Sequence, residues 1–341
     1  MTILLTGGAG YIGSVLTLKL LDKGYKVRIF DRFFFGRDHL PKHRNLELVS
    51  GDIRRFDEKN LFAIDCIIHL AALSNDPTAE FNPKANHEIN YLATKRLAYL
   101  AKRAGISRFI YASSCSVYYT TSAKSRERLF TEDDQVAPRA PYSNSKWLSE
   151  NALLELKSKD FAPIILRAGT VYGFSPRMRY DLVVNTMTKD AMSKKSIFVT
   201  ARGIQWRPIV DIEDLASAYL LMIAAPQDLV SGQTFNILYD NFQVREIARQ
   251  IQKATDGNAK VHIDQVMTNF VDRSYKVSKV KIEKLLKFHA KKSPEESVRE
   301  MVRLIKRNKM VDFDNPKYYN INWMLTLAEI NPDVFKYGPI I

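Results

Sequence analysis

Tyr142 and Lys146 stand four residues apart in the segment Tyr142-Ser143-Asn144-Ser145-Lys146. In a helix, residues at this spacing share one face, so a phenol and an ammonium can lie side by side. A free phenol has a pKa of about 10, which is too high for a base at neutral pH. A neighbouring positive charge favours the phenolate and lowers that pKa. The pair can therefore act as a general base that takes a proton from a substrate hydroxyl, although the spacing alone is common in helices.

A glycine-rich turn near the N-terminus is the second feature with chemical meaning. Its first glycine, Gly7, permits a tight turn, Gly10 lets the backbone approach a pyrophosphate, and Gly13 lets helix and strand pack closely. The free N–H groups of the helix that follows attract phosphate. We therefore predict that a dinucleotide's pyrophosphate binds at the turn Thr6-Gly7-Gly8-Ala9-Gly10-Tyr11-Ile12-Gly13.

Acidic residues follow the next two predicted strands. Asp31 ends the second strand, where a carboxylate accepts hydrogen bonds from a ribose diol and repels a 2′-phosphate. This favours NAD over NADP, although the adjacent Arg32 could accommodate that phosphate. Asp52 and Ile53 follow the third strand and are placed to reach the adenine, but Gly-Asp is also an ordinary turn pair.

Other kinds of chemistry find less support in the sequence. The six histidines show no paired spacing of metal ligands, so we predict no metal. The pair Ser113-Ser114 has no convincing triad partner, which argues against a hydrolase. Two cysteines, Cys66 and Cys115, indicate a reducing compartment.

The composition is that of a soluble globular protein of 341 residues, with 46% hydrophobic and 26% charged residues. No apolar stretch is long enough to span a membrane and no signal peptide is recognisable, so we expect a cytoplasmic protein. The net charge of +14 could indicate nucleic acid or an anionic membrane surface. Since no nucleic-acid motif is present, we interpret the charge as solvated lysines with a few arginines for an anionic substrate.

Strand and helix patterns alternate in the first half of the chain, which predicts a doubly wound parallel sheet of the Rossmann type with helices on both faces. A helical pattern starts at Ile12 and another fills Ala93–Ala104. The expected strands are Ile3–Thr6, Lys26–Phe30, Leu46–Val49, Cys66–Leu70, Phe109–Ala112 and Ile164–Leu166.

After Gly173 the pattern loosens into a smaller α+β lobe. A helix at Ile212–Ala225 and a strand at Thr234–Leu238 could return to the main sheet and make this lobe discontinuous. We therefore predict a dinucleotide-binding domain at 1–170 plus about 212–240, and a substrate-binding lobe at 171–211 plus 241–310. Residues 311–341 form an appended segment whose function the sequence does not indicate.

Taken together, the glycine turn, the Tyr142/Lys146 pair and the run Ser113-Ser114-Cys115-Ser116-Val117-Tyr118 resemble the extended short-chain dehydrogenase/reductase family. More narrowly, the chain is similar to its NAD-dependent nucleotide-sugar epimerases and dehydratases, of the UDP-glucose 4-epimerase type. The similarity runs from Met1 to about Lys309. The segment Ser175-Pro176-Arg177-Met178-Arg179 resembles a branch that acts on varied nucleotide sugars.

This resemblance implies roles for further residues. Ser114 would hydrogen-bond the sugar O4, and Lys146 would also hold the nicotinamide ribose. Leu70, Ala71 and Ala72 would lie over the cofactor. Asn90 matches an asparagine near the active site, with helix capping or a core network as the alternative. Substrate contacts are implied for Ser116, Thr170, Asn185, Arg207 and Arg273, of which the two arginines would clamp the diphosphate.

Departures from the family pattern narrow the reaction. Dehydratases of the family carry Asp-Glu where this chain has Cys115-Ser116, which argues against a 4,6-dehydratase. Thr170 and Tyr119 stand where UDP-galactose 4-epimerases carry asparagine and glycine, so the identity of the sugar stays open.

We predict an NAD-dependent nucleotide-sugar 4-epimerase. The alternatives are a C4 dehydrogenase or 4-keto reductase with dissociable NAD(H), and a non-catalytic NAD-sensing or RNA-binding module. Family dimerisation implies a homodimer through residues 89–104 and 145–157.

Overall fold

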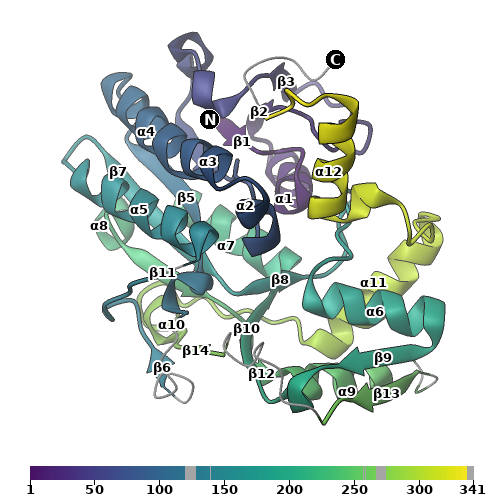
Figure 1. The fold of residues 1–341 in the computed structure, drawn as a ribbon. Coiled ribbons are helices and arrows are strands. Elements are labelled where there is room, and N and C mark those ends of the chain that lie inside the picture. The colour runs from purple at the N-terminus through teal and green to yellow at the C-terminus, as the bar shows by residue number, and fades with distance from the viewer. Residues whose placement is uncertain (120–127, 139, 256, 258, 266–273, 336–341) are drawn as a thin grey trace.

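A seven-stranded sheet forms the centre of the computed structural model, which describes residues 1–119, 128–138, 140–255, 257, 259–265 and 274–335. Neighbouring strands are parallel throughout, which confirms the predicted Rossmann class (Figure 1). The strand order is β11-β7-β5-β4-β1-β2-β3, so the direction of winding reverses between β1 and β4. The strands are β1 (Thr2–Thr6), β2 (Lys26–Asp31), β3 (Leu46–Ser50), β4 (Cys66–His69), β5 (Arg108–Ser114), β7 (Ala162–Ala168) and β11 (Thr234–Ile237).

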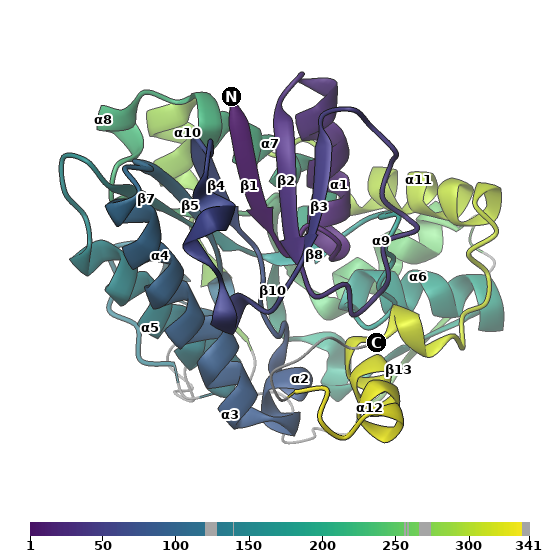
Figure 2. The ribbon, with the colours of Figure 1, turned by 90° about the horizontal axis from the view of Figure 1, so that it is seen from above.

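Alternation of side chains along each strand supplies two apolar layers. In β1, Ile3 and Leu5 join one core and Leu4 joins the other, and all three are fully buried. Helices α1 (Tyr11–Asp22) and α7 (Ile212–Ala224) cover the first face, while α4 (Ala93–Arg103) and α5 (Pro141–Glu155) cover the second (Figure 2). The central strands are therefore buried on both faces, and their carboxyl ends are the part available to a ligand.

The chain leaves the large sheet after β7 and returns to it with β11, which pairs with β7 from Thr234↔Ile165 to Ile237↔Ala168. The strand predicted at Thr234–Leu238 thus joins the main sheet. Residues outside the large sheet build small sheets with the orders β12-β10-β8, β13-β9 and β14-β6, and only β6 among their strands precedes β7. Their strands are β6 (Leu129–Phe130), β8 (Thr170–Tyr172), β9 (Ser196–Val199), β10 (Trp206–Asp211), β12 (Asp240–Gln243), β13 (Lys260–Ile263) and β14 (Lys276–Val277).

Helices of varied length complete the second lobe and the connections. Those of the lobe are α6 (Val183–Lys194), α9 (Val244–Ala254) and α11 (Pro294–Arg307), whereas α8 (Gln227–Val230) contacts β7 and α10 (Val280–Leu286) contacts β11 of the large sheet. Among the residues described, no helix combines the length and the apolar character needed to cross a membrane. The connections near β3, β4 and β5 contain η1 (Ile53–Arg55), η2 (Glu58–Leu61), α2 (Asp76–Phe81), α3 (Pro83–Asn86), the π-helical turn η3 (His87–Leu92) and η4 (Cys115–Tyr118).

The C-terminal segment folds back onto the N-terminal half of the molecule. After η8 (Pro316–Tyr318), helix α12 (Asn320–Ile330) packs beside α2, beyond the carboxyl ends of β1–β3 (Figure 1, Figure 2). Met324 and Leu327 are buried there and form a small core with Val334, against Phe34 and Phe35 of the loop after β2. The segment predicted only as an appendage therefore lies where the sheet presents its ligand-binding edge.

Candidate active site

A cleft of about 1270 Å³, partly open to solvent, lies at the carboxyl ends of the central strands. Its position at the reversal between β1 and β4 is where open α/β sheets bind ligands. Most of the predicted cofactor and catalytic residues line it, namely Gly7, Gly10, Tyr11, Ile12, Gly13, Asp31, Arg32, Asp52, Ile53, Leu70, Ala71, Ala72, Tyr142 and Lys146.

The glycine turn is a close-packed backbone cradle. Gly7 adopts a φ of +72°, and a Cβ there would lie 2.6 Å from the backbone nitrogen of Ala71. A Cβ on Gly13 would lie 2.4 Å from the carbonyl oxygen of Gly7. Both positions require glycine because the obstructing atoms belong to the backbone and cannot swing away. The turn leads directly into α1, whose first N–H groups face the cleft, so these residues fit a dinucleotide's pyrophosphate.

The adenosine end of the cleft carries two predicted carboxylates with different surroundings. Asp31 accepts hydrogen bonds from the backbone N–H groups of Ala9 (3.0 Å) and Phe33 (2.8 Å). Burial raises its pKa, and these hydrogen bonds oppose the rise. Arg32 donates to Asp52 at 2.9 Å, and both side chains are nearly buried. Arg32, the residue that could have received the 2′-phosphate of NADP, is thus held by Asp52. This arrangement favours NAD over NADP.

Tyr142 and Lys146 lie on one face of α5. Lys146 Nζ lies 5.8 Å from the Tyr142 ring centroid and donates a hydrogen bond of 2.8 Å to the carbonyl of Ala112 in β5. Burial raises the pKa of the Tyr142 phenol to about 12 and Asp76 adds to this, whereas Arg179 and a hydrogen bond with Ser114 lower it. Burial lowers the pKa of Lys146 to about 7. The phenol is therefore neutral at pH 7 in the protein alone, whereas the lysine is partly charged.

Behind this pair lies a buried ionic network that the sequence did not indicate. Arg167 of β7 donates to both carboxylate oxygens of Glu150, at 3.0 Å and 2.6 Å, and to the Tyr118 hydroxyl at 2.6 Å. Ser113 also donates to Glu150. Glu150 follows Lys146 by one helical turn, and its charge partly restores the pKa of the lysine. The network fixes α5 against β5 and β7 and so positions Tyr142 and Lys146.

Two predicted asparagines do not line the cleft, because protein groups occupy their amides. Asn90 exchanges hydrogen bonds with both backbone groups of Leu73, at 2.8 Å and 3.0 Å, and donates to Asn86 and Ser145. The core-network alternative therefore describes its placement. Asn185 accepts from the backbone N–H of Gly173 and donates to the Tyr11 hydroxyl. Both asparagines position the loops that form the cleft.

The remaining predicted substrate residues are dispersed. Ser114 ends β5 next to Tyr142. Ser116 lies one turn further, with its hydroxyl buried and without a hydrogen-bond partner among the described residues. Thr170 begins β8, and Arg207 in β10 donates to the Trp206 carbonyl at 2.9 Å; neither lines the cleft. Arg273 lies outside the described residues.

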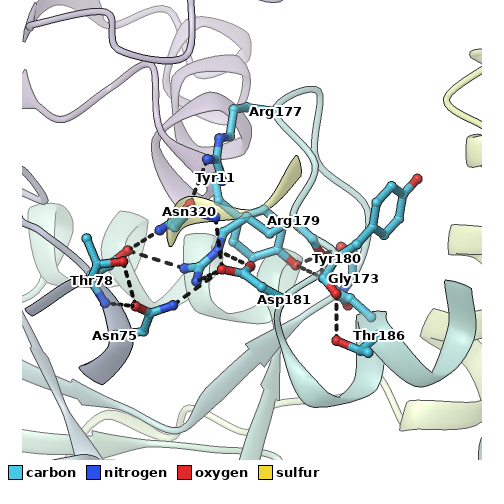
Figure 3. Close-up of polar contacts among 12 residues, drawn as sticks. Tyr11, Asn75, Thr78, Gly173, Arg177, Arg179, Tyr180, Asp181, Thr186 and Asn320 are labelled. Carbon is cyan, nitrogen blue, oxygen red and sulfur yellow. Dashed lines mark hydrogen bonds and ion pairs between the residues drawn. The ribbon is translucent and has the colours of Figure 1, made fainter. Parts of the chain in front are cut away.

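Three polar residues that sequence reasoning did not assign, Arg177, Arg179 and Asn320, also line the cleft, and Asp181 contacts two of them. Figure 3 shows Arg177, Arg179 and Asp181 gathered around Asn320 at the start of α12. Arg179 forms a bidentate ion pair with Asp181, at 2.8 Å and 3.0 Å. The only local signal was the paired arginines after Pro176, whereas nothing in the sequence connected them to the C-terminal segment.

No group of three histidine, cysteine, aspartate or glutamate side chains comes together as a metal site within the described ranges. Cys66 and Cys115 are both free and buried.

Comparison with known proteins identifies the family. Residues 3–237 match the NAD-dependent epimerase/dehydratase family. A UDP-glucuronic acid decarboxylase of Danio rerio is 29% identical over 246 residues, which are 69% of this chain and 58% of that protein. This chain therefore spans less than two thirds of that relative.

Two further proteins are similar over more of their length. An uncharacterised UDP-glucose epimerase of Bacillus subtilis is 31% identical over 252 residues, 70% of this chain and 76% of that protein. The crystal structure of a UDP-glucuronic acid 4-epimerase from Bacillus cereus, in complex with UDP-glucuronic acid and NAD, superimposes with a TM-score of 0.78. Its sequence identity is 25%, over 90% of this chain and 100% of that one. The chain belongs to the NAD-dependent epimerase/dehydratase family, and its cofactor is NAD.

Proposed function

We propose that this protein is a nucleotide-sugar 4-epimerase that acts through a 4-keto intermediate. The observation that carries the proposal is the convergence of three groups on the cofactor cleft. Tyr142 and Lys146 line it together with the glycine turn, and Ser114 hydrogen-bonds the Tyr142 phenol. A base beside a dinucleotide site suits oxidation of a secondary hydroxyl.

In this proposal NAD supplies a reversible hydride acceptor for the sugar carbon. The Tyr142 phenolate takes the proton of the C4 hydroxyl as the carbon–hydrogen bond breaks, so that C4 becomes a carbonyl. The hydroxyl of Ser114 orients that oxygen. After the keto sugar rotates in the site, the hydride returns to the opposite face of C4 and Tyr142 gives the proton back to the C4 oxygen. Lys146 favours the phenolate by its charge.

The residues after Ser114 support a reaction without elimination. Cys115 is fully buried and donates a hydrogen bond of 3.1 Å to the Arg167 carbonyl, and burial raises the pKa of its thiol. Ser116 cannot act as an acid at neutral pH. Neither side chain can supply the proton transfer needed to expel water from C5 and C6, which argues against a 4,6-dehydratase.

The proposal is tested by incubating the purified protein separately with UDP-glucose, UDP-N-acetylglucosamine, UDP-glucuronic acid and a GDP-heptose, and reading the C4 configuration by NMR. Appearance of the C4 epimer with no net change in NADH supports it. Stoichiometric consumption of added NAD(H) without an epimer would instead establish the C4 dehydrogenase or reductase. Loss of CO₂ from UDP-glucuronic acid would assign a decarboxylase, the activity named for the Danio rerio relative.

A homodimer through residues 89–104 and 145–157 is part of the same proposal. Helices α4 and α5 lie side by side on one face of the sheet (Figure 2). Leu92, Tyr99 and Leu154 in this region are exposed, at 46%, 52% and 37%. Exposed apolar side chains on adjacent helices suit a self-complementary interface. Light scattering that gives the mass of a single chain, 39.1 kDa, would contradict the dimer.

A further inference from the structure

Asn320, the first residue of α12, connects three segments around the cleft. Its Oδ1 accepts a hydrogen bond of 2.6 Å from Arg177, and its Nδ2 donates at 2.7 Å to Ser74 in the loop after β4. Its backbone N–H donates to Asp181 at 3.1 Å. The side chain is nearly buried, and Figure 3 shows it between the two arginines. Asn320 thus joins the C-terminal segment to both loops that border the cleft.

Arg177 is a buried cation that lines the cleft and is only 5% exposed. Its guanidinium stacks on Phe35 at 3.5 Å from the ring centroid, and Asn320 accepts from one terminal nitrogen. Among the described residues, Nε has no hydrogen-bond partner and no carboxylate forms an ion pair with the side chain. The neighbouring carboxylate of Asp181 is occupied by Arg179.

A buried charge without a counter-ion is costly. Burial, followed by the repulsion of Arg179, lowers the pKa of Arg177 to about 9. Asp181 and Asp31 favour the charged form without forming an ion pair with it, so the side chain stays charged at neutral pH. It lines the cleft together with Tyr11 of the first turn of α1. That turn also attracts anions, through its free N–H groups and the helix dipole. The buried guanidinium of Arg177 and the N-terminal turn of α1 therefore both favour a negatively charged group in this part of the cleft.

We propose that Arg177 is a counter-ion for the cofactor's pyrophosphate, and that α12 holds it there through Asn320 so that NAD remains bound between turnovers. The proposal rests on the binding of NAD and not on the reaction at the sugar.

The packing of α12 explains how it retains the cofactor. Met324 lines the cleft and is buried, and Trp323 Nε1 donates to the carbonyl of Phe34 at 2.5 Å. This contact ties α12 to the loop on the adenosine side, while Asn320 and the packing against α2 tie it to the loop after β4. The helix therefore connects both sides of the cleft, and cofactor release requires these contacts to open.

The test measures binding to the nucleotide-stripped full chain by calorimetry, with NADH, ADP-ribose and adenosine as probes. For Arg177→Met we expect NADH and ADP-ribose to bind about 10- to 100-fold more weakly, because a charge-assisted hydrogen bond is lost. Adenosine, which has no phosphate, should bind as before. Arg177→Lys should recover part of the affinity, because it keeps the charge. Arg303→Met, an exposed arginine on α11, is the matched control.

The contribution of α12 is read from the rate at which NADH leaves, followed by its fluorescence after rapid dilution. We expect Asn320→Ala to release NADH about tenfold faster than Leu325→Ala, which alters an exposed residue of the same helix. Unchanged ADP-ribose affinity in Arg177→Met, or an equal loss for adenosine, would overturn the role of Arg177. Equal release rates for the two α12 variants would overturn the role of the helix. These readouts need no turnover, so they stand apart from the test of 4-epimerisation.

Discussion

The two walls of the cofactor cleft are built in different ways. The turn wall, residues 7–13, consists of backbone atoms that are neighbours in sequence and offers N–H groups. The charged wall consists of Arg177, Arg179, Asp181 and Asn320, whose side chains meet across a separation of up to 143 residues. The first wall is determined by local geometry, whereas the second exists only when the C-terminal segment has docked.

This difference predicts different sensitivities to mutation. The turn wall has no room for an additional atom, because its obstructing neighbours are backbone groups. The charged wall depends on the Arg179–Asp181 ion pair and on the hydrogen bonds of Asn320, and the desolvation of its charges is compensated only when the partners are present. Substitutions that add an atom to the turn wall, or that remove a charge from the charged wall, can therefore test this difference between the walls.

The largest effect is expected at the turn wall. Gly13→Ala places a Cβ 2.4 Å from the Gly7 carbonyl oxygen, so the turn must deform and NAD binding should be lost. Gly10→Ala meets the same oxygen at 3.2 Å, so the turn itself should deform much less and this variant should unfold closer to the wild-type temperature. Its affinity for NAD should fall as well, because the pyrophosphate approaches the backbone at Gly10. Thermal unfolding, together with calorimetric titration with NAD, measures both variants. Equal unfolding temperatures in the two variants would contradict the account of the turn.

Between the walls, Tyr142→Phe removes the proposed base without changing either wall. We expect kcat to fall by about 10²–10⁴-fold while the affinity for NAD stays unchanged. Single-turnover assays and NAD titration on the same preparation separate the two quantities. Retention of more than a tenth of the wild-type kcat would show that another group takes the proton.

At the charged wall, Asp181→Asn leaves Arg179 buried without its ion-pair partner. We expect the free energy of unfolding to fall by about 3–5 kcal/mol, as measured in urea. Glu47→Gln is the control, because Glu47 pairs with Arg28 on the surface and should contribute less than about 1 kcal/mol. If Asp181→Asn is as stable as the control variant, the ionic contacts of this wall contribute little to stability.

The smallest effect concerns pH. Activity should rise with pH, because the phenolate of Tyr142 is the reactive form and the pKa of the phenol in the protein, raised chiefly by burial, is about 12. Charged Lys146 and bound NAD both lower that pKa in the complex. In Lys146→Met the ascending limb of the pH profile of kcat/KM should therefore shift to higher pH by about one unit. Lys146→Arg, which keeps the charge, should leave the limb closer to wild type, and a profile identical in both variants would contradict this role.

Sequence reasoning was most successful where a function depends on neighbours along the chain. The strand before Gly7 and the helix after it have the predicted order, and Asp31 ends β2. Tyr142 and Lys146 share a helix face because their spacing fixes it. Asn90 and Asn185 were less predictable, since an amide serves a ligand or a loop equally well. Only the packing of the folded chain decides which groups form hydrogen bonds with the amide.

The sequence by itself determined the glycine turn, the acid at the end of β2 and the Tyr142/Lys146 pair, because each depends on local backbone geometry. The tertiary structure alone decided that Glu150 and Arg167 stand behind Tyr142 and Lys146, and that α12 completes the cleft. These contacts join residues far apart in the chain, and hydrophobic patterns carry no signal for which buried polar groups will meet. Their pairing follows from the cost of burying a charge, which is relieved only where the folded chain brings its partner.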